Sequence, residues 1–541
     1  MLLTKFQLTS RPFDRDFLIF GEEVWSFGRF CDEVRRATEW LAAEGVGAGT
    51  VLAVCGPYSP RALAVFFAAA DLKAILVPMT EMNEAERDRR FRAAGVEAVI
   101  EKLEVRSENE EGDRRDEGTF EVQRAEDRGY RLSVIGSQGR FKVEDARERF
   151  KARGSKFDVD GKKRSEPSTE DSTSSGNTED AGVDGPGGPG YQARSESRRA
   201  IRSAGHSARH PLIRQLVRAG RSGLILFSSG TTGEPKAMLH DLGRLVEGYS
   251  IKEGPGPRTL AFLHYDHIGG LDILFRALAS GASLVIPEDR DPGTIARLIE
   301  RHRIEVLPAS PTFLNLFLLS GVAEKYDLSA LRIVGYGSEP MPEPLLNRLQ
   351  DTFPEVRFQQ KFGTSETSAI RIVGRSPGSL EMKVEDSRVE WKAVDGELWI
   401  RSPARIVGYL NVESDSLSAD GWYRTGDLVE ETGDGFFRIV GRRSDLINVG
   451  GEKVFPSEVE SVLMELPEIR ECRVFGEENA LTGQVVAVEV VASEDFSAME
   501  LKRRIRAFCR NRLEPHKTPV KVYRVEGIQL GGSFKKRRGG E

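Results

Sequence analysis

Residues 227–236 read FSSGTTGEPK, and this short segment decides how the rest of the chain is interpreted. It follows the apolar run LILF (224–227), ends on Lys236, and gathers small hydroxyl and glycine residues: Ser228, Ser229, Gly230, Thr231, Thr232 and Gly233. Glycines let a backbone approach a ligand closely, and amides, hydroxyls and a lysine all favour an anion. We expect a helix after the loop, with its positive end adding to the site. The segment predicts a phosphate-binding loop, the alternative being a flexible surface loop.

The position of Lys236 excludes one common type of phosphate loop. The P-loop pattern GxxxxGK[ST] requires the lysine directly after its second glycine. Here Lys236 stands three residues beyond Gly233, with Pro235 between them. The nucleotide-binding loop of a P-loop NTPase is therefore not the right interpretation.

Runs typical of strands and helices alternate on both sides of this loop, over residues 17–103 and 210–360. Such alternation favours parallel sheets covered by helices. From about residue 381 short strands with turns, such as VEWKAV-DG-ELWI (389–400), favour a small barrel-like part. We expect an α/β fold with a large amino-terminal domain (1–440) and a small, mobile α+β carboxy-terminal domain (441–541).

A segment of different character interrupts the first domain at about residues 104–209. Residues 160–205 contain almost no large apolar side chains, so they cannot bury enough surface to offset the entropy of ordering, and we predict disorder there. In the earlier part of this segment, YRLSVIG (130–136) and FKVEDARERFKARG (141–154) favour a small strand–helix unit.

Composition restricts the functional classes that the chain can belong to. The formal net charge of −6 gives no reason to expect nucleic acid as a partner. The four cysteines lie far apart without metal-ligand spacing, which favours reduced thiols over a disulfide framework or a zinc site. Neither a signal peptide nor an integral membrane segment is expected, because charged residues interrupt the apolar stretches. We expect a cytoplasmic protein.

Four further segments complete a pattern with the loop. These are FGTSE (362–366), YRTGDL (423–428), GRRSDLINVGGEKVFPSEVE (441–460) and SFKKRR (533–538). Together with SSGTTGEPKAM (228–238), in this order, they resemble the adenylate-forming superfamily of acyl-CoA synthetases, luciferases and peptide-synthetase adenylation domains. The resemblance covers the chain except about residues 104–209.

The resemblance implies a site for ATP and Mg²⁺. The loop would hold the β- and γ-phosphates, and the segment GYGSEP would line the adenine through Gly337, Ser338, Glu339 and Pro340. Phe362, at a position that is usually Tyr, would stack beside adenine, and Gly363, Thr364 and Ser365 would lie at the phosphates. Glu366 would bind Mg²⁺, for which a hard carboxylate oxygen is well suited. Asp427 would accept from both ribose hydroxyls, and Arg442 would lie near the ribose or the α-phosphate.

A lysine near the carboxyl terminus is the implied catalytic residue. We assign Lys535, with Lys536 as the alternative, because SFK departs from the usual GK context of the superfamily. Its charge would neutralise the carboxylate and the α-phosphate as they join. Lys236, Thr364 and Glu366 complete the predicted catalytic set. Without the resemblance, KKRR would be interpreted as a solvated basic tail.

Other positions would contact the acid and the thiol. His267, in LHYDHIGGLD, would line the acid, although Asp266 next to it could take that place and a structural histidine is equally compatible. Gly450, Gly451 and Lys453 would approach the thiol acceptor. Ser444 occupies the position of the hinge between the two domains, where the superfamily commonly has Asp or Lys.

The resulting functional hypothesis is ATP-dependent activation of a small carboxylic acid. Acyl-AMP and pyrophosphate would form first, and the acyl group would pass to CoA, with a fatty or aryl acid as substrate. A phosphopantetheine thiol on a carrier protein is the alternative acceptor. A luciferase-like oxygenase and a non-catalytic nucleotide-binding regulator are the alternatives from other classes.

Overall fold

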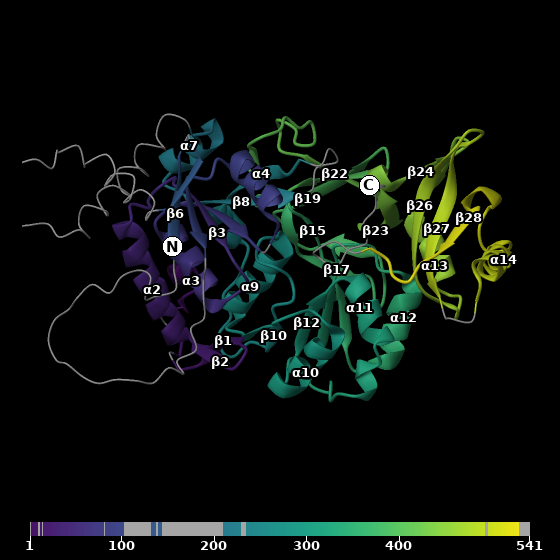
Figure 1. Cartoon of the computed structure of the whole chain (residues 1–541), viewed down its shortest axis with the longest axis horizontal. Helices are drawn as coiled ribbons and strands as arrows, with labels where there is room; N and C mark the ends of the chain where they lie inside the picture. The colour runs from purple at the N-terminus through teal and green to yellow at the C-terminus, as the bar shows by residue number, and fades with distance from the viewer. Residues whose placement is uncertain are drawn as a thin grey trace, which may run out of the picture.

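The computed structural model describes residues 2–8, 11–12, 14–80, 82–101, 131–136, 139–142, 209–228, 234–492 and 496–529. The predicted disorder across 160–205 lies outside these residues, and so does the predicted helix in 141–154 except for its first two residues, which end a strand (Gly139–Lys142). The strand predicted in YRLSVIG is present as Arg131–Gly136. Figure 1 shows the chain running from the purple amino-terminal helices to the yellow carboxy-terminal sheet.

A seven-stranded sheet forms the lower part of the molecule in Figure 1. Its strands pair in parallel except for the hairpin at one edge, which joins β1 to β2. Parallel strands bring their carboxyl ends to one edge, where ligands bind in open α/β sheets. The strands in spatial order are β14 (Arg357–Gln360), β13 (Ile333–Tyr336), β12 (Val306–Ala309), β10 (Thr259–Leu260), β11 (Leu284–Ile286), β1 (Asp16–Phe20) and β2 (Glu23–Ser26).

An eight-stranded sheet lies above the first. Its centre is parallel, and antiparallel strands extend it at both edges, so the sheet is mixed. The spatial order is β21 (Gly408–Tyr409), β9 (Lys236–Asp241), β8 (Gly223–Ser228), β4 (Ile75–Met79), β3 (Val51–Cys55), β5 (Ala98–Glu101), β6 (Arg131–Gly136) and β7 (Gly139–Lys142).

Helices α2 (Phe27–Ala43), α3 (Pro60–Asp71) and α9 (Ile268–Ser280) contribute to one core that both sheets share. Leu18 and Leu284 enter this core from the first sheet, and Leu52 and Leu76 enter it from the second. The alanine-rich α3 is buried on nearly all sides, which its small side chains allow. The other helices of these two layers are α1 (Leu2–Lys5), α4 (Glu84–Ala94), α7 (Pro211–Arg218), α8 (Leu242–Glu247), α10 (Pro292–His302), α11 (Pro311–Leu319), η3 (Val322–Glu324) and α12 (Glu343–Thr352).

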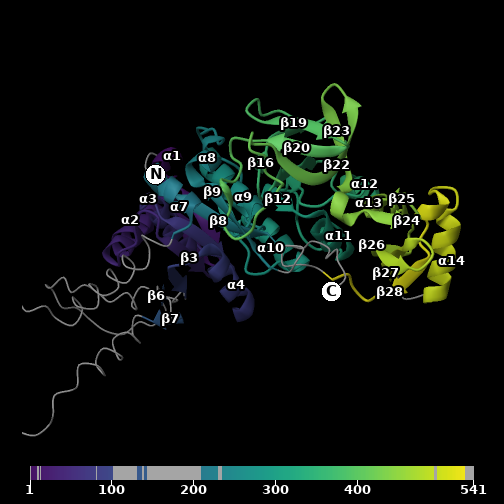
Figure 2. The same cartoon turned by 90° about the horizontal axis from the view of Figure 1, so that it is seen from above.

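The short strands predicted after residue 381 form an antiparallel six-stranded sheet, which stands above the rest of the chain in Figure 2. Its β19–β20 hairpin turns at Asp395 and Gly396, which both have positive φ, as the DG pair predicts. The spatial order is β17 (Ile372–Gly374), β18 (Met382–Val384), β23 (Phe436–Arg442), β22 (Tyr423–Gly433), β20 (Glu397–Arg401) and β19 (Glu390–Val394). The hairpin of β15 (Phe362–Thr364) and β16 (Ser368–Ile370) lies between this sheet and the first.

The last part of the chain builds its own sheet and its own hydrophobic core. The strands pair in the order β25 (Glu452–Val454), β24 (Ile447–Val449), β27 (Gly483–Ala492) and β26 (Ile469–Asn479), and β28 (Lys521–Arg524) pairs in parallel with β27. Helices α13 (Pro456–Leu463) and α14 (Ala498–Cys509) cover it, with η4 (Arg443–Asp445) before it and η5 (Pro515–Lys517) within it. The predicted α/β fold with a smaller α+β unit is confirmed.

One predicted element is wrong. The residues after the phosphate loop form strand β9, which pairs antiparallel with β8 from Ser228↔Lys236 to Gly223↔Asp241. The reason is burial, because five consecutive residues of β9 are buried beside β8. A strand donates no converging amides of the kind found at a helix end, so the helix-dipole contribution expected at the loop is removed.

Within the described ranges, no helix combines the length and the apolar character needed to cross a membrane.

Candidate functional site

Two segments predicted to contact the nucleotide leave the first sheet at the same edge. Strands β13 and β14 pair in parallel up to Tyr336↔Gln360, so the residues that follow each strand emerge side by side. At Gly337 an added Cβ would lie 2.6 Å from the carbonyl oxygen of Lys361, which is too close for any other residue. Ser338 adopts a positive φ of 72°, which turns the chain away from the sheet.

Glu339 has a structural partner at this edge. Its Oε1 accepts a hydrogen bond of 2.8 Å from the backbone nitrogen of Thr312, in the first turn of α11. A carboxylate at a helix amino terminus stabilises the helix. Glu339 therefore fixes the GYGSEP segment, which includes Pro340, to α11.

The FGTSE segment forms β15 and a tight turn. The hydroxyl oxygens of Thr364 and Thr367 each accept from the other residue's backbone nitrogen, at 3.1 and 3.2 Å, and lie 3.1 Å apart. Gly363 packs against β16, because an added Cβ would lie 2.3 Å from the carbonyl oxygen of Ser368. The turn thereby holds Ser365 and Glu366 in one conformation. Sequence reasoning missed Thr367, although two threonines three residues apart are a signal for such a turn.

Phe362 lies in a core rather than on an open surface. Its ring is 9% exposed and packs edge-to-face on Phe437, with 6.3 Å between the ring centroids. Little of the ring is left for stacking on a ligand in this arrangement.

Glu366 is a buried carboxylate oriented by two tyrosines. It is 9% exposed, and its Oε1 accepts a hydrogen bond of 3.1 Å from the hydroxyl of Tyr409 on β21. The hydroxyl of Tyr423, at the start of β22, interacts with both groups. Burial, followed by the charge of Glu366, raises the pKa of both tyrosines, so they remain protonated donors at neutral pH. Tyr423 stands in the YRTGDL motif, but Tyr409 carries no signal beyond its place in GYLN (408–411).

Asp427 and Arg442 lie opposite each other on β22 and β23. The Arg442 Nε donates to Asp427 Oδ1 at 3.0 Å, and Asp427 is only 6% exposed. Burial raises the pKa of Asp427; Arg442 opposes this shift, and the charges of Asp445 and then Glu366 add to it. Asp427 and Glu366 are thus two buried carboxylates whose charges interact, and Arg442 pairs with Asp427.

The turn that carries Asp427 is held from the neighbouring strand. Thr425 Oγ1 accepts from the Asp427 nitrogen at 3.0 Å and donates to the Leu398 carbonyl at 2.8 Å. Gly426 has a φ of 74° and donates its nitrogen to Glu397 Oε1 at 3.2 Å. Glu397, which the sequence did not single out, also pairs with Arg443 at 3.4 Å.

The carboxylates of Glu366 and Asp427 fit the implied ligands, which are Mg²⁺ and the ribose hydroxyls. A carboxylate has four acceptor positions, so Asp427 retains capacity for ribose hydroxyls after bonding Arg442. Glu366 offers a hard, oriented oxygen, which is the ligand that Mg²⁺ prefers. The positive charge of a metal would also relieve the repulsion between the two buried carboxylates.

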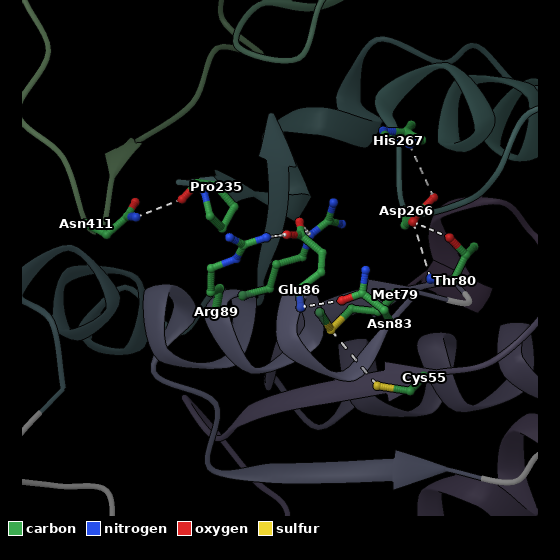
Figure 3. A network of polar contacts seen from close by, with 11 residues as sticks. Cys55, Met79, Thr80, Asn83, Glu86, Arg89, Pro235, Asp266, His267 and Asn411 are labelled. Carbon is green, nitrogen blue, oxygen red and sulfur yellow. Dashed lines mark hydrogen bonds and ion pairs between the residues drawn. The ribbon is translucent and has the colours of Figure 1, made fainter. Parts of the chain in front are cut away.

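The ends of the phosphate loop lie close together, where the β8–β9 hairpin opens. Ser228 is the last residue of β8 and pairs with Lys236, the first of β9. Asn411 clamps the end of the loop, because its Nδ2 donates to the Pro235 carbonyl at 2.8 Å and its Oδ1 accepts from the Ala237 nitrogen at 2.9 Å (Figure 3). No sequence signal identified Asn411. The loop residues Ser229, Gly230, Thr231, Thr232 and Gly233 lie outside the described residues.

Asp266, rather than His267, is the buried member of the predicted acid-lining pair. Asp266 is 5% exposed and its Oδ2 accepts from the Thr80 hydroxyl at 2.6 Å and from the Thr80 nitrogen at 3.2 Å. The side chain of His267 is 44% exposed, and its Nε2 lies 3.8 Å from Asp266 Oδ1 (Figure 3). Burial raises the pKa of Asp266, but His267 and Thr80 outweigh burial and lower it. His267 is thus the member placed to meet a ligand.

The residues predicted to meet the thiol lie on the carboxy-terminal sheet. Gly450 and Gly451, with φ of 63° and 98°, form the turn between β24 and β25, and exposed Lys453 follows on β25. The Gly451 nitrogen donates to Asn448 Oδ1 at 2.9 Å. Ser444 lies in η4, the link between β23 and this sheet. Lys535 and Lys536 lie outside the described residues.

Comparisons with known proteins match both parts of the chain. The family model described as AMP-binding enzyme matches residues 5–410, and the one described as AMP-binding enzyme C-terminal domain matches residues 458–535. A 2-succinylbenzoate–CoA ligase of Bacillus subtilis (strain 168) is 30% identical over 336 residues, which are 58% of this chain and 66% of the relative. A 4-coumarate–CoA ligase-like protein 2 of Arabidopsis thaliana is 30% identical over 355 residues, or 60% and 61%.

The chain thus spans less than two thirds of the length of these two curated relatives, 66% and 61%. The fold also matches a crystal structure of the anthranilate CoA ligase AuaEII in complex with anthranoyl-AMP. The TM-score is 0.70 at 20% identity, over 99% of this chain and 95% of the other.

Proposed function

The chain belongs to the AMP-binding enzyme family, and from this premise we propose that it is an adenylate-forming acid–CoA ligase. The observation that carries the proposal is the pair of buried carboxylates, Glu366 and Asp427. Two such groups close together are costly unless cations and hydrogen-bond donors meet them. Tyr409, Tyr423 and Arg442 supply part of this compensation, and a metal–nucleotide complex would supply the rest.

In the first half-reaction, a carboxylate oxygen of the acid attacks the α-phosphorus of ATP. A phosphorus–oxygen bond forms to the acyl group, and pyrophosphate leaves with the electron pair of the broken bond. Asp427 would accept from the ribose hydroxyls while Arg442 holds its carboxylate in place, and Glu366 would hold Mg²⁺. Bound Mg²⁺ would offset phosphate charge at this point. The predicted contributions of the loop residues 228–233, Lys236 and Lys535 belong to this step.

In the second half-reaction, the thiol sulfur of CoA attacks the acyl carbonyl carbon. AMP leaves with the bonding electron pair, the thiol releases its proton, and a thioester results. We propose that residues from 441 onward form a separate domain that turns about Ser444 between the two steps. The turn would bring Gly450, Gly451 and Lys453 to the thiol, so that one site serves both reactions.

The proposed acid is an aryl acid rather than a fatty acid. The relatives are named for succinylbenzoate, coumarate and anthranilate, which are all aryl acids. Pocket selectivity differs between members of one fold, so this part of the proposal rests on similarity alone.

A two-stage assay tests the proposed function. Acid-dependent exchange of labelled pyrophosphate into ATP is measured over a panel of aryl and fatty acids, and thioester formation is then measured with CoA and with a carrier protein. We expect exchange with at least one aryl acid and transfer to CoA. If no acid supports exchange, the result would favour a non-catalytic nucleotide-binding regulator. Transfer to the carrier protein alone would show that its phosphopantetheine thiol, and not CoA, is the acceptor. Light emission with oxygen would indicate a luciferase-like oxygenase.

A further inference from the structure

Lys361 occupies an unusual place between β14 and β15. Its backbone nitrogen donates to the Tyr336 carbonyl at 2.7 Å, and its side chain runs along β13. A Cβ added at Gly335 would lie 3.3 Å from Lys361 Cε, and one added at Gly337 would lie 3.2 Å from Lys361 Cβ. Gly335 of β13 and Gly337 directly after it therefore provide the room in which this lysine lies.

The side chain of Lys361 lies on the opposite side of the chain from the neighbouring aromatic residue. Successive residues of an extended chain point to opposite faces, and Phe362 packs on Phe437 of the six-stranded sheet. Lys361 instead lies near Asp272 and Arg276 of α9, whose charges both act on it. Helix α9 begins directly after His267, the candidate residue for the acid. Lys361 thus lies between Gly337, which is predicted to line the adenine, and α9, the helix that follows His267.

Arg276, Asp272 and Arg357 carry the charges that act on Lys361, so positive charge exceeds negative charge around it. Asp272 is already held by Tyr249, whose hydroxyl donates at 2.8 Å, and by Arg276, whose Nε donates at 2.7 Å. Lys361 Nζ donates only to the neutral side chain of Gln359, at 3.3 Å, among the described residues. Burial and then Arg276 lower the pKa of Lys361, although the residue keeps exposed surface. An exposed lysine with an excess of positive charge around it is a candidate partner for a bound anion.

We propose that the acid substrate carries a second anionic group, a carboxylate, and that Lys361 binds it. The proposal rests on the proposed function, because it concerns the acid that this site activates. One carboxylate reacts at the α-phosphate, and the other, at the distal end of the molecule, pairs with the Lys361 ammonium beside the Asp272–Arg276 pair. Lys361 would be the residue that separates diacids from uncharged acids of the same shape.

Matched substrate pairs test this role. Each pair consists of an aryl diacid (terephthalate, 4-(carboxymethyl)benzoate or 2-succinylbenzoate) and the monoamide in which its distal carboxylate is replaced. The full-length enzyme is compared with Lys361→Gln, with Lys361→Arg, and with Lys325→Gln, a matched variant at an exposed lysine after η3. The quantity measured is kcat/KM for adenylate formation on each member of each pair.

The expected result is a preference of the wild-type enzyme for the diacid of at least one pair by tenfold or more. Lys361→Gln should remove that preference by lowering kcat/KM for the diacid alone, and Lys361→Arg should retain part of it. Lys325→Gln should leave kcat/KM unchanged for both the diacid and the monoamide. Equal losses on both members, or a wild-type enzyme that prefers no diacid, would overturn the proposal.

A binding measurement keeps this test separate from that of the proposed function. If no acid supports pyrophosphate exchange, the proposed function fails, and the thermal shift of the protein with each diacid and monoamide is used instead. Stabilisation by a diacid that Lys361→Gln abolishes supports the anion site. Stabilisation independent of Lys361, or none with any diacid, contradicts it.

Discussion

Glu366 shows how a single residue is prepared for nucleotide chemistry before any ligand binds. The Thr364–Thr367 turn fixes its backbone, and Tyr409 fixes one of its oxygens. A carboxylate that is already desolvated and oriented loses little on meeting a hard cation, which is the basis of preorganised sites.

Replacing Glu366 by Gln should lower the rate of adenylate formation by about a hundredfold, because the amide cannot provide a charged oxygen to Mg²⁺. The measurement is kcat for pyrophosphate release, with Glu355→Gln, at an exposed glutamate, as the matched control. Activity within threefold of wild type would show that Glu366 is not the metal residue.

His240 on β9 predicts a pH dependence of stability. It is fully buried, neither ring nitrogen has a hydrogen-bond partner among the described residues, and burial lowers its pKa to about 4. The unfolded chain, with an ordinary pKa of about 6.5, binds the proton first. The free energy of unfolding should therefore fall as the pH drops from 6.5 towards 4, by about 2 kcal/mol between pH 7 and 5 from this residue.

Denaturant unfolding of wild type and His240→Leu at pH 7 and pH 5 measures this contribution. The variant should lose less stability than wild type over this interval, because Leu does not titrate. His264, whose pKa is also lowered to about 4 by burial and then Arg290, contributes equally in both proteins. Identical losses in the two proteins would exclude the assigned role of His240.

At the scale of elements, the β8–β9 hairpin replaces the strand–loop–helix unit that the glycine-rich loop suggested. The hairpin fixes both ends of the loop. Asn411, two residues after β21, binds the backbone of Pro235 and Ala237 at the end of the loop. The loop is thereby anchored by backbone pairing rather than by a helix.

Replacing Asn411 by Ala removes two hydrogen bonds at the end of the loop, each contributing about 1 kcal/mol. The KM for ATP should rise by about five- to tenfold, and the melting temperature should fall by a few degrees. Initial-rate kinetics with Asn347→Ala, at an exposed asparagine of α12, provide the comparison. An unchanged KM would mean that the loop does not depend on this clamp.

Features that depend on neighbouring residues could be predicted from the sequence, whereas features that depend on contacts distant in the sequence could not. Helices with a clear apolar periodicity, such as α10, and the turn at Asp395–Gly396 were predictable from local residue types. The secondary structure of KAMLHD (236–241) was not predictable, because a short apolar run fits a strand and a helix equally. Its pairing with β8 makes it a strand. Glu366 and Asp427 were predictable from their motifs, but Tyr409, Asn411 and Lys361 act through contacts distant in the sequence.

At the scale of the whole molecule, the carboxy-terminal sheet is connected to the rest through few polar contacts. Asn315 Nδ2 on α11 donates to the Arg470 carbonyl on β26 at 3.1 Å, and Ser457 Oγ donates to the Val440 carbonyl at 2.9 Å. Figure 1 shows this sheet beside α12, at the end of the molecule. Such limited attachment is suited to a unit that changes position around the η4 link.

Replacing Ser444 by Pro should separate the two half-reactions. Proline fixes its own φ and disfavours helical geometry at the preceding residue, so rotation within η4 would be restricted. We expect pyrophosphate exchange within a few-fold of wild type and thioester formation lowered by tenfold or more, with Ser444→Ala close to wild type in both assays. Equal effects of the proline on both half-reactions would contradict a hinge at this position.

The central claim is that the acid is activated as an acyl-adenylate. The most direct measurement uses an aryl acid labelled with ¹⁸O in its reacting carboxylate, with ATP, Mg²⁺ and CoA, and mass spectrometry of the released nucleotide. Attack of the carboxylate on the α-phosphorus predicts AMP that carries one ¹⁸O atom, because the bond between the acyl carbon and that oxygen breaks on transfer to the thiol. Unlabelled AMP, or ADP with labelled phosphate, would contradict the account.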